Sequence, residues 1–136
     1  MRKVLVVLLM MLVLAPICYS QTIRNSNNSV VARIDDDGTV RNSNNSVIGR
    51  FGSNGDIRDS NNRYLGKIDR NGDVRDSQNS YLGKVESNGT VRNRNNSTLG
   101  KVESDGTVRD SNSHLLGTAK GVPMRYAAAF FFFGFY

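Results

Sequence analysis

Residues Val74 to Thr90 read VRDSQNSYLGKVESNGT, and most of the chain repeats this stretch. Near copies start at Ile23, Val40, Ile57 and Val91, and a truncated copy starts at Val108. Each start lies 17 residues after the previous one. A fixed short period is typical of a repeat protein, in which each unit buries its apolar face only by packing on its neighbours.

Two turn signals divide each unit, numbered here from position 1 at Val74 to position 17 at Thr90. Positions 15 and 16 read Asn88-Gly89 in this copy, and Asn-Gly is the strongest short-range hairpin signal. It predicts a three-residue loop with a positive φ at the glycine. Positions 3 to 7 read mostly Asn/Asp-Ser-Asn-Asn-Ser, residues whose side chains bond to local backbone groups in turns. Each unit is therefore predicted to form two strands of four to five residues.

Apolar residues occupy positions 1, 9 and 12 of the unit, as Val74, Leu82 and Val85 show. Strict alternation would place positions 9 and 12 on opposite faces of a strand. Glycine at position 10, such as Gly83, predicts a β-bulge there that turns both positions inward. Position 12 is then expected to face position 1 of the next unit, and the basic residue at position 11 to face the arginine at position 2.

The fold class predicted from these patterns is all-β, a closed radial array of short β-hairpins built from 17-residue repeats. An open β-hairpin solenoid is the alternative, but it would need polar caps at both ends. Positions 1 to 10 occur in six copies, so the number of blades predicted for the ring is either five or six. The predicted organisation is a signal peptide at 1–20, the repeat domain at 21–117 and an Ala/Phe-rich tail at 118–136.

The first twenty residues have the pattern of a secretory signal peptide. Arg2 and Lys3 precede an apolar run, and small residues at Cys18 and Ser20 suit cleavage after Ser20. A lipoprotein anchored at Cys18 is disfavoured because Ile17 stands where a small residue is needed. The chain is thus expected to be exported to the periplasm, the outer-membrane surface or the extracellular space. Removal of the leader lowers the formal net charge from +6 to +4, because two cations leave.

The tail is strongly aromatic. Seven of the eleven residues from Tyr126 to Tyr136 are aromatic, and exposure of such a segment would promote aggregation. It is too short to span a membrane as a helix. We expect it to fill the apolar centre of the ring as a plug, with the alanines passing a narrow opening and the phenylalanines filling the space. Contact with a membrane surface, through Phe130, Phe131, Phe132 and Phe133, is the alternative.

Basic residues at positions 2 and 11 form the main candidate ligand-binding set. A ring or stripe of such side chains could hold phosphate, sulfate or an acidic glycan. The competing explanation is that each arginine pairs with a nearby carboxylate such as Asp59, Asp76 or Glu86. Two tyrosines at position 8 are candidates for stacking on a sugar ring, with rim packing as their alternative. The candidate residues are Arg41, Arg58, Arg75, Arg92, Lys67, Lys84, Lys101, Tyr64 and Tyr81.

Catalytic, metal and cofactor sites are not predicted. His114 is the only histidine, and it replaces a turn serine in the last unit. The run from Asp69 to Asp73 has the acidic spacing that opens an EF-hand loop, but Val74 stands where glycine is required. Nucleic acid is an unfavoured partner, because the chain is expected to be exported and lacks aromatic residues interleaved along its basic face.

The repeated V-R-D-S-x-N-x-x-L-G-K-V-x-x-x-G, the leader and the Ala/Phe-rich end resemble the small secreted five-fold β-flower proteins of Bacteroidetes. The resemblance covers Ile23 to Tyr136 and implies hairpins around a pseudo-five-fold axis. It implies no activity and no catalytic residues. The expected function is that of an exported, non-enzymatic binding module for a glycan or polyanion at the bacterial envelope. The alternative is a structural or self-assembling envelope component that docks on an envelope protein through its tail.

Overall fold

The computed structural model describes residues 21–136, so the predicted signal peptide and the Cys18 alternative lie outside the described residues. Twelve short strands fill most of this range, and one helix follows them near the end of the chain. The strands are β1 (Gln21–Asn25), β2 (Val30–Ile34), β3 (Thr39–Asn42), β4 (Val47–Phe51), β5 (Asp56–Asp59), β6 (Tyr64–Ile68), β7 (Asp73–Asp76), β8 (Tyr81–Val85), β9 (Thr90–Asn93), β10 (Thr98–Val102), β11 (Thr107–Asp110) and β12 (Leu115–Thr118). The helix is α2 (Met124–Phe132).

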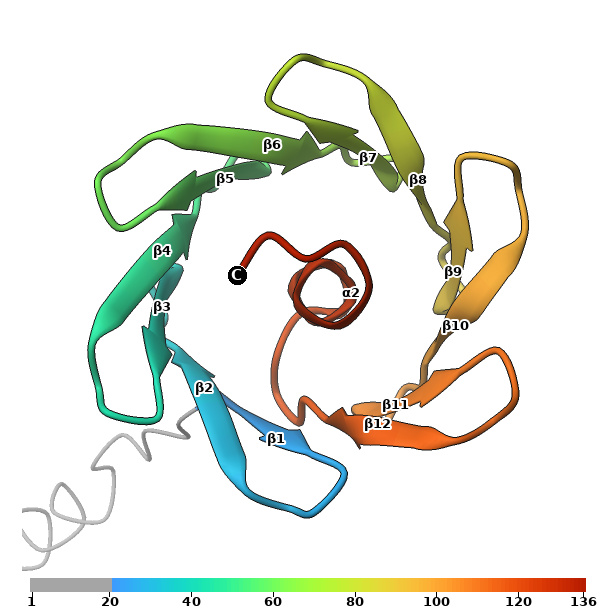
Figure 1. Ribbon diagram of the computed structural model, residues 1–136, viewed down its shortest axis with the longest axis horizontal. Coiled ribbons are helices and arrows are strands. Elements are labelled where there is room, and N and C mark those ends of the chain that lie inside the picture. Colours follow the sequence, from blue (N-terminus) through green and yellow to red (C-terminus); the bar gives the residue numbers. More distant parts are fainter. Residues whose placement is uncertain (1–20) are drawn as a thin grey trace, which may run out of the picture.

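Each strand pairs in antiparallel fashion with its neighbours in the sequence, and β12 pairs with β1 to complete a closed barrel. The closed array is therefore confirmed, and the open solenoid is wrong. The twelve strands form six hairpins, from β1–β2 to β11–β12, and Figure 1 shows how they are arranged around the ring. The ring thus has six blades rather than the five implied by the resemblance, because the first copy contributes a full hairpin that pairs with the last.

The Asn-rich run forms the turn inside each hairpin, as predicted. In the β5–β6 hairpin, Asp59 Oδ1 accepts hydrogen bonds from the backbone N–H groups of Asn61 at 2.8 Å and Arg63 at 2.9 Å. Asn62 adopts φ = 66°, the left-handed region that asparagine tolerates better than most residues. The polar composition of positions 3 to 7 is therefore explained by turn geometry.

The glycine loops connect consecutive hairpins at the opposite rim. Gly52 and Asp56 bracket the loop between β4 and β5, and Gly55 donates its N–H to the Gly52 oxygen at 3.1 Å. Gly55 has φ = 92°, and a Cβ there would collide with the carbonyl oxygen of Ile68. The Ile68 N–H in turn donates to the Gly55 oxygen at 3.0 Å, so the loop is bonded to the next hairpin.

The inner wall follows the predicted pairing. Position 12 lies opposite position 1 of the next unit, as Ile68 pairs with Val74, and both side chains are buried. The β-bulge is also present, but its extra residue is Leu65 rather than the glycine. Gly66 pairs with Ile57 and Tyr64 pairs with Arg58, so Leu65 between them has no partner in the ladder. Leu65 remains half-buried and packs against the core, so position 9 turns inward less completely than expected.

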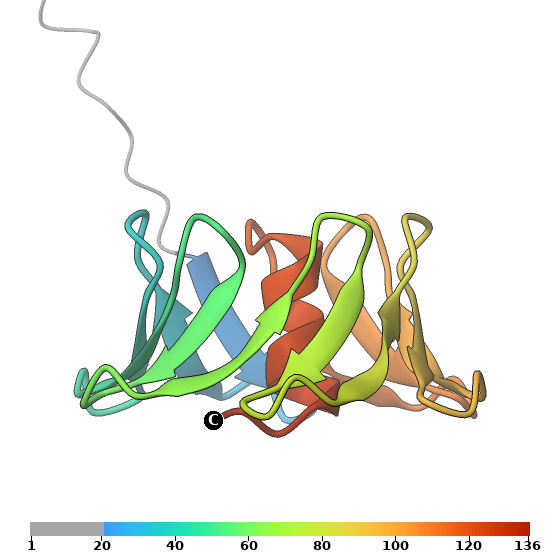
Figure 2. The ribbon, with the colours of Figure 1, turned by 90° about the horizontal axis from the view of Figure 1, so that it is seen from above.

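The tail lies inside the ring, which confirms the predicted plug. Figures 1 and 2 show α2 running through the centre of the ring, roughly along its axis. Ala127, Ala128 and Ala129 are fully buried, whereas the four phenylalanines that follow are half-buried. The four phenylalanines pack against the core, as expected of rings that fill the space, and the three alanines lie within α2. Within residues 21–136, no helix has the length and apolar character needed to span a membrane.

Candidate functional site

The outer wall of the ring carries basic residues in facing pairs. Positions 2 and 11 point outward because their neighbours in each strand point into the core. At the seam between two hairpins, position 11 of one unit therefore lies directly opposite position 2 of the next, as predicted. The five pairs are Arg33 with Arg41, Arg50 with Arg58, Lys67 with Arg75, Lys84 with Arg92, and Lys101 with Arg109.

The position 2 arginines have a structural role that the sequence did not reveal. Each donates from Nη1 to the backbone oxygen of the left-handed residue in the turn of its own hairpin, as Arg58 does to Asn62 O at 3.1 Å. This bond satisfies a carbonyl group that no strand partner reaches. The six donor and acceptor pairs are Arg24 with Asn28, Arg41 with Asn45, Arg58 with Asn62, Arg75 with Asn79, Arg92 with Asn96, and Arg109 with Ser113.

Carboxylates neutralise several of these arginines further. Arg92 Nε lies 2.8 Å from Glu86 Oε1, which confirms Glu86 as a predicted partner. The other two predicted acids act elsewhere: Asp59 lies 3.4 Å from Arg63, and Asp76 accepts two backbone N–H groups in its turn. The remaining ion pairs of this kind are Arg41 with Asp35, Arg58 with Asp56, and Arg109 with Glu103.

The position 11 cations differ from the position 2 arginines, and we call them the basic girdle: Arg33, Arg50, Lys67, Lys84 and Lys101. Lys67 lies 3.9 Å from Asp69, at the limit of an ion pair. Across the part of the chain that the structure describes, the side chains of the other four make no ion pair or hydrogen bond. Arg33, Arg50 and Lys101 are exposed, and the two remaining lysines are half-buried.

The two candidate tyrosines lie beside arginines of the same hairpins. The guanidinium carbon of Arg58 is 5.6 Å from the centroid of the Tyr64 ring, and that of Arg75 is 5.7 Å from the Tyr81 ring. This geometry suits a cation–π interaction. Tyr64 is still 36% exposed, and stacking of the tyrosines on a sugar ring stays a prediction. Their first role is to pack against the position 2 arginines.

Shallow hollows lie along the seams of the outer wall. A hollow of about 340 Å³ contains both cations of the β4–β5 seam, Arg50 and Arg58, together with Asn54, Asp56 and Asn62. A smaller hollow, of about 180 Å³, lies at the closing seam between β1 and β12, where Thr118 stands opposite Arg24. The facing cation pairs are therefore interrupted at the seam that closes the ring.

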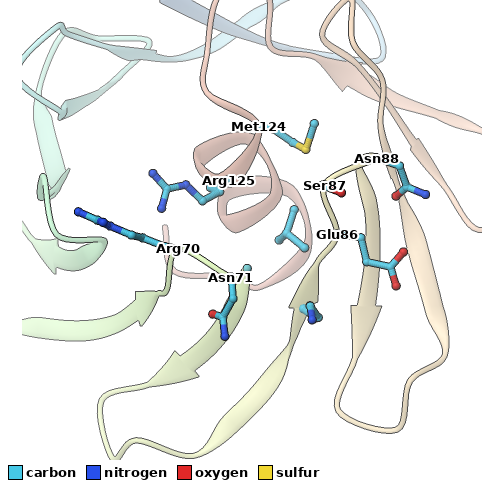
Figure 3. Close-up of a pocket in the computed structure, with 10 residues that line it drawn as sticks. Arg70, Asn71, Glu86, Ser87, Asn88, Met124 and Arg125 are labelled. Atoms are coloured by element: carbon cyan, nitrogen blue, oxygen red, sulfur yellow. The ribbon is translucent and has the colours of Figure 1, made fainter.

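A larger pocket, of about 570 Å³, opens at the rim where α2 begins (Figure 3). We call it the rim pocket. Two glycine loops and the first residues of the helix form it. The lining residues are Arg70, Asn71, Gly72, Lys84, Val85, Glu86, Ser87, Asn88, Met124 and Arg125. Sequence reasoning identified only Lys84 here as a candidate ligand residue and missed the rest of the pocket.

His114 is exposed in its turn and lies 3.4 Å from Asp110, in keeping with its predicted turn position. Among residues 21–136, no group of three or more histidine, cysteine, aspartate or glutamate side chains is arranged to hold a metal ion.

Phe51 anchors the end of the tail to the wall. It is the one aromatic residue at position 12, and its ring stacks on Tyr126 at a centroid distance of 4.1 Å. Tyr136 meets the same ring edge-on at 5.6 Å and donates its hydroxyl to the Arg58 oxygen at 2.8 Å. A phenylalanine in place of the usual Val or Ile was the sequence signal for this contact. It could not be interpreted without knowing that the tail lies inside.

Burial raises the pKa of Tyr136 to about 12, and the charge of Asp59 also disfavours the phenolate. Because an unfolded tyrosine ionises near 10, the neutral hydroxyl contributes stability in full below pH 10 and loses it as pH rises toward 12. We expect Tyr136→Phe to lower the free energy of unfolding by about 1 kcal/mol at pH 8. The difference in the free energy of unfolding between the variant and the unmodified protein, measured by urea titration, should narrow between pH 10 and 12. A gap that stays constant to pH 12 would contradict this assignment.

The geometry can be compared with known proteins. A family model described as "5-fold beta-flower protein" matches residues 52–135, more than half of the chain. This stretch includes strands β5 to β12 and helix α2. Searches of the curated proteins and of the solved structures find no match.

Proposed function

The chain belongs to the 5-fold beta-flower proteins, and we propose that this ring is a non-enzymatic binding module that holds an acidic polymer, such as an acidic glycan, on its basic girdle. In this proposal each 17-residue unit supplies one hairpin and most units supply one contact to the polymer. The leader-like sequence at 1–20 supports a site of action outside the cytoplasm, at the bacterial envelope.

The observation that carries the proposal is the placement of cation opposite cation at five seams. Like charges directly opposite in a sheet destabilise it, whereas a carboxylate at position 11 would have stabilised the seam. Arginine at position 2 is explained by its bond to the turn. The cation at position 11 has no such explanation, so its positive charge favours a role in binding.

The spacing of the girdle suits a long anion better than a small one. One exposed or half-buried girdle cation per seam gives weak attraction to any single charged group, because solvent and salt screen it. Several contacts made along one polymer raise the overall affinity, because each contact after the first is intramolecular. Tyr64 and Tyr81 add ring surface beside two of the seams, on which a sugar ring could stack.

The test compares two triple variants that lose the same charge. Arg33→Gln/Lys67→Gln/Lys101→Gln removes three girdle cations, and Arg63→Gln/Arg94→Gln/Lys120→Gln removes three cations from turns and the rim. We expect the unmodified protein to bind heparin at low salt and to release it as salt rises. The girdle variant should lose at least tenfold in affinity, and the matched variant should lose much less. Equal losses, or no heparin binding by the unmodified protein, would reject the proposal.

Position 2 provides a further contrast. Replacing Arg58, Arg75 and Arg92 with Gln removes three bonds to turn carbonyls, together with the Arg58–Asp56 and Arg92–Glu86 ion pairs. This variant is expected to be less stable, whereas the girdle variant should melt at or above the temperature of the unmodified protein. Binding and stability are thereby separated between the two positions.

Docking through the aromatic tail, on an envelope protein or a membrane surface, has less support. Tyr126 and Tyr136 contact Phe51 within the ring, and the four phenylalanines pack against the core. Their use on a partner would require the plug to leave. The girdle is available without any such change.

A further inference from the structure

We infer that the rim pocket is a second, separate binding site that takes a small sugar bearing a phosphate or sulfate monoester. The pocket volume, about 570 Å³, falls within the range of small-molecule sites. Figure 3 shows Arg70 and Arg125 on one side of the pocket and Glu86 on the other. The site is distinct from the girdle, apart from Lys84, which lines both.

The cations of the rim pocket are not neutralised. Arg70, Lys84 and Arg125 form no ion pair or side-chain hydrogen bond within residues 21–136. The one carboxylate of the pocket, Glu86, is already bonded to Arg92 at 2.8 Å. Three positive side chains at one pocket with one engaged carboxylate favour an anionic ligand.

Arg70 is a departure from the repeat. It occupies position 14, where the other complete units carry Asp36, Ser53, Ser87 and Ser104. The loop geometry does not require arginine there, because the same three-residue loop forms with serine or aspartate in the other units. A cation placed once in a repeated loop, at the edge of the rim pocket, indicates a function confined to this side of the ring.

Arg125 also occupies an electrostatically unfavourable position. It lies in the first turn of α2, next to the positive end of the helix dipole, where an acidic residue would be favourable. That turn has no acidic residue and no side-chain cap. A bound anion would reverse the sign of this interaction and accept hydrogen bonds from the planar guanidinium groups, which match a phosphate or sulfate oxygen pair.

The rest of the lining indicates the body of the ligand. Asn71, Ser87 and Asn88 offer amide and hydroxyl groups, and all three are exposed in the loops rather than buried. Met124 supplies an apolar edge, as sugar-sized ligands often require beside their polar contacts. A compact polar molecule with one strongly charged ester is therefore a better fit than a hydrophobic ligand or a bare chain of charges.

The experiment measures binding of glucose 6-phosphate, glucose 6-sulfate and glucose to the full chain without its leader, by calorimetry and by amide chemical shifts. We expect both esters, or one of them, to bind and to shift the amides of the two loops and the start of α2, with glucose at least tenfold weaker. The two ester arms tell phosphate recognition from sulfate recognition. Binding of neither ester, or binding of glucose equal to both, would overturn the inference.

Variants identify the site and keep it separate from the girdle. Arg70→Ser, which restores the residue of three other units, and Arg125→Gln should each weaken ester binding about tenfold, the effect of one charged hydrogen bond. Arg94→Gln is the matched control. Heparin binding should be unchanged by Arg70→Ser, and ester binding should survive in the girdle variant. Unchanged ester affinity in Arg70→Ser would reject the pocket, and unchanged heparin affinity in the girdle variant would reject only the girdle.

Discussion

Deletion of Tyr126 to Tyr136 is expected to open the ring and leave the protein largely unfolded at room temperature. These residues include three fully buried alanines and seven aromatic side chains. All seven rings are half-buried and pack against the core, and Tyr126 stacks on Phe51. Removing them exposes the inner row of valines and isoleucines to water. The hairpins are then short, two-stranded elements with no common core to stabilise them.

The size of this effect follows from the surface involved. Burying one large apolar side chain contributes about 1.5–3 kcal/mol, and half-burial contributes roughly half of that. The aromatic side chains of the tail therefore account for at least about 5 kcal/mol, which equals the whole stability of many small domains. We expect the truncated chain to lose its cooperative thermal transition by circular dichroism and to bind a hydrophobic dye strongly.

A milder variant tests the contribution of the tail without removing the helix. Tyr126→Ala removes the ring that stacks on Phe51 but leaves the helix and its alanines in place. It should lower the free energy of unfolding by about 2 kcal/mol, from the half-burial of the ring and its stacking on Phe51. If the truncated chain instead remains folded and becomes more soluble, the tail does not support the ring, and docking through the tail becomes the better proposal.

The architecture was predictable because local signals agreed with one another. The Asn-rich turn, the Asn-Gly loop and the apolar positions all specify a hairpin, and each pairing of position 12 with position 1 was confirmed. The number of blades and the helical state of the tail were not predictable. Both depend on how the whole ring closes, and the stretch from Met124 carries helix-forming alanines beside aromatic residues that favour strands.

The candidate site was predictable only by residue type. Sequence placed basic residues on one face, and the structure confirmed that positions 2 and 11 face each other. It could not separate their roles, because the bond from Arg58 to the Asn62 oxygen depends on the turn conformation. Arg70 was visible as a break in the repeat, but its meaning depends on α2 approaching the same rim, which only the closed ring determines.

Gly100→Val is expected to lower the free energy of unfolding by about 3 kcal/mol, at the upper end of the cost of overpacking a core. Gly100 is buried at position 10, where the sequence predicted the bulge, but the extra residue of the bulge is Leu99 and Gly100 is not in the left-handed region. A Cβ at Gly100 would collide with the Arg109 carbonyl oxygen and lie 2.7 Å from Cε1 of Phe132. The glycine therefore makes room for a ring of the plug.

The same contact recurs around the wall, which makes the prediction specific. A Cβ at Gly66 would lie 2.7 Å from Phe135, and one at Gly117 would lie 2.9 Å from Phe131. Gly52→Asp is the matched control, because the nearest atom to a Cβ there is the flexible end of Asn54 at 3.1 Å. Other units also carry an acid at this position. Thermal and urea unfolding should leave Gly52→Asp within about 0.5 kcal/mol of the unmodified protein. Equal stability of Gly100→Val and Gly52→Asp would mean that the tail does not occupy the space these glycines leave.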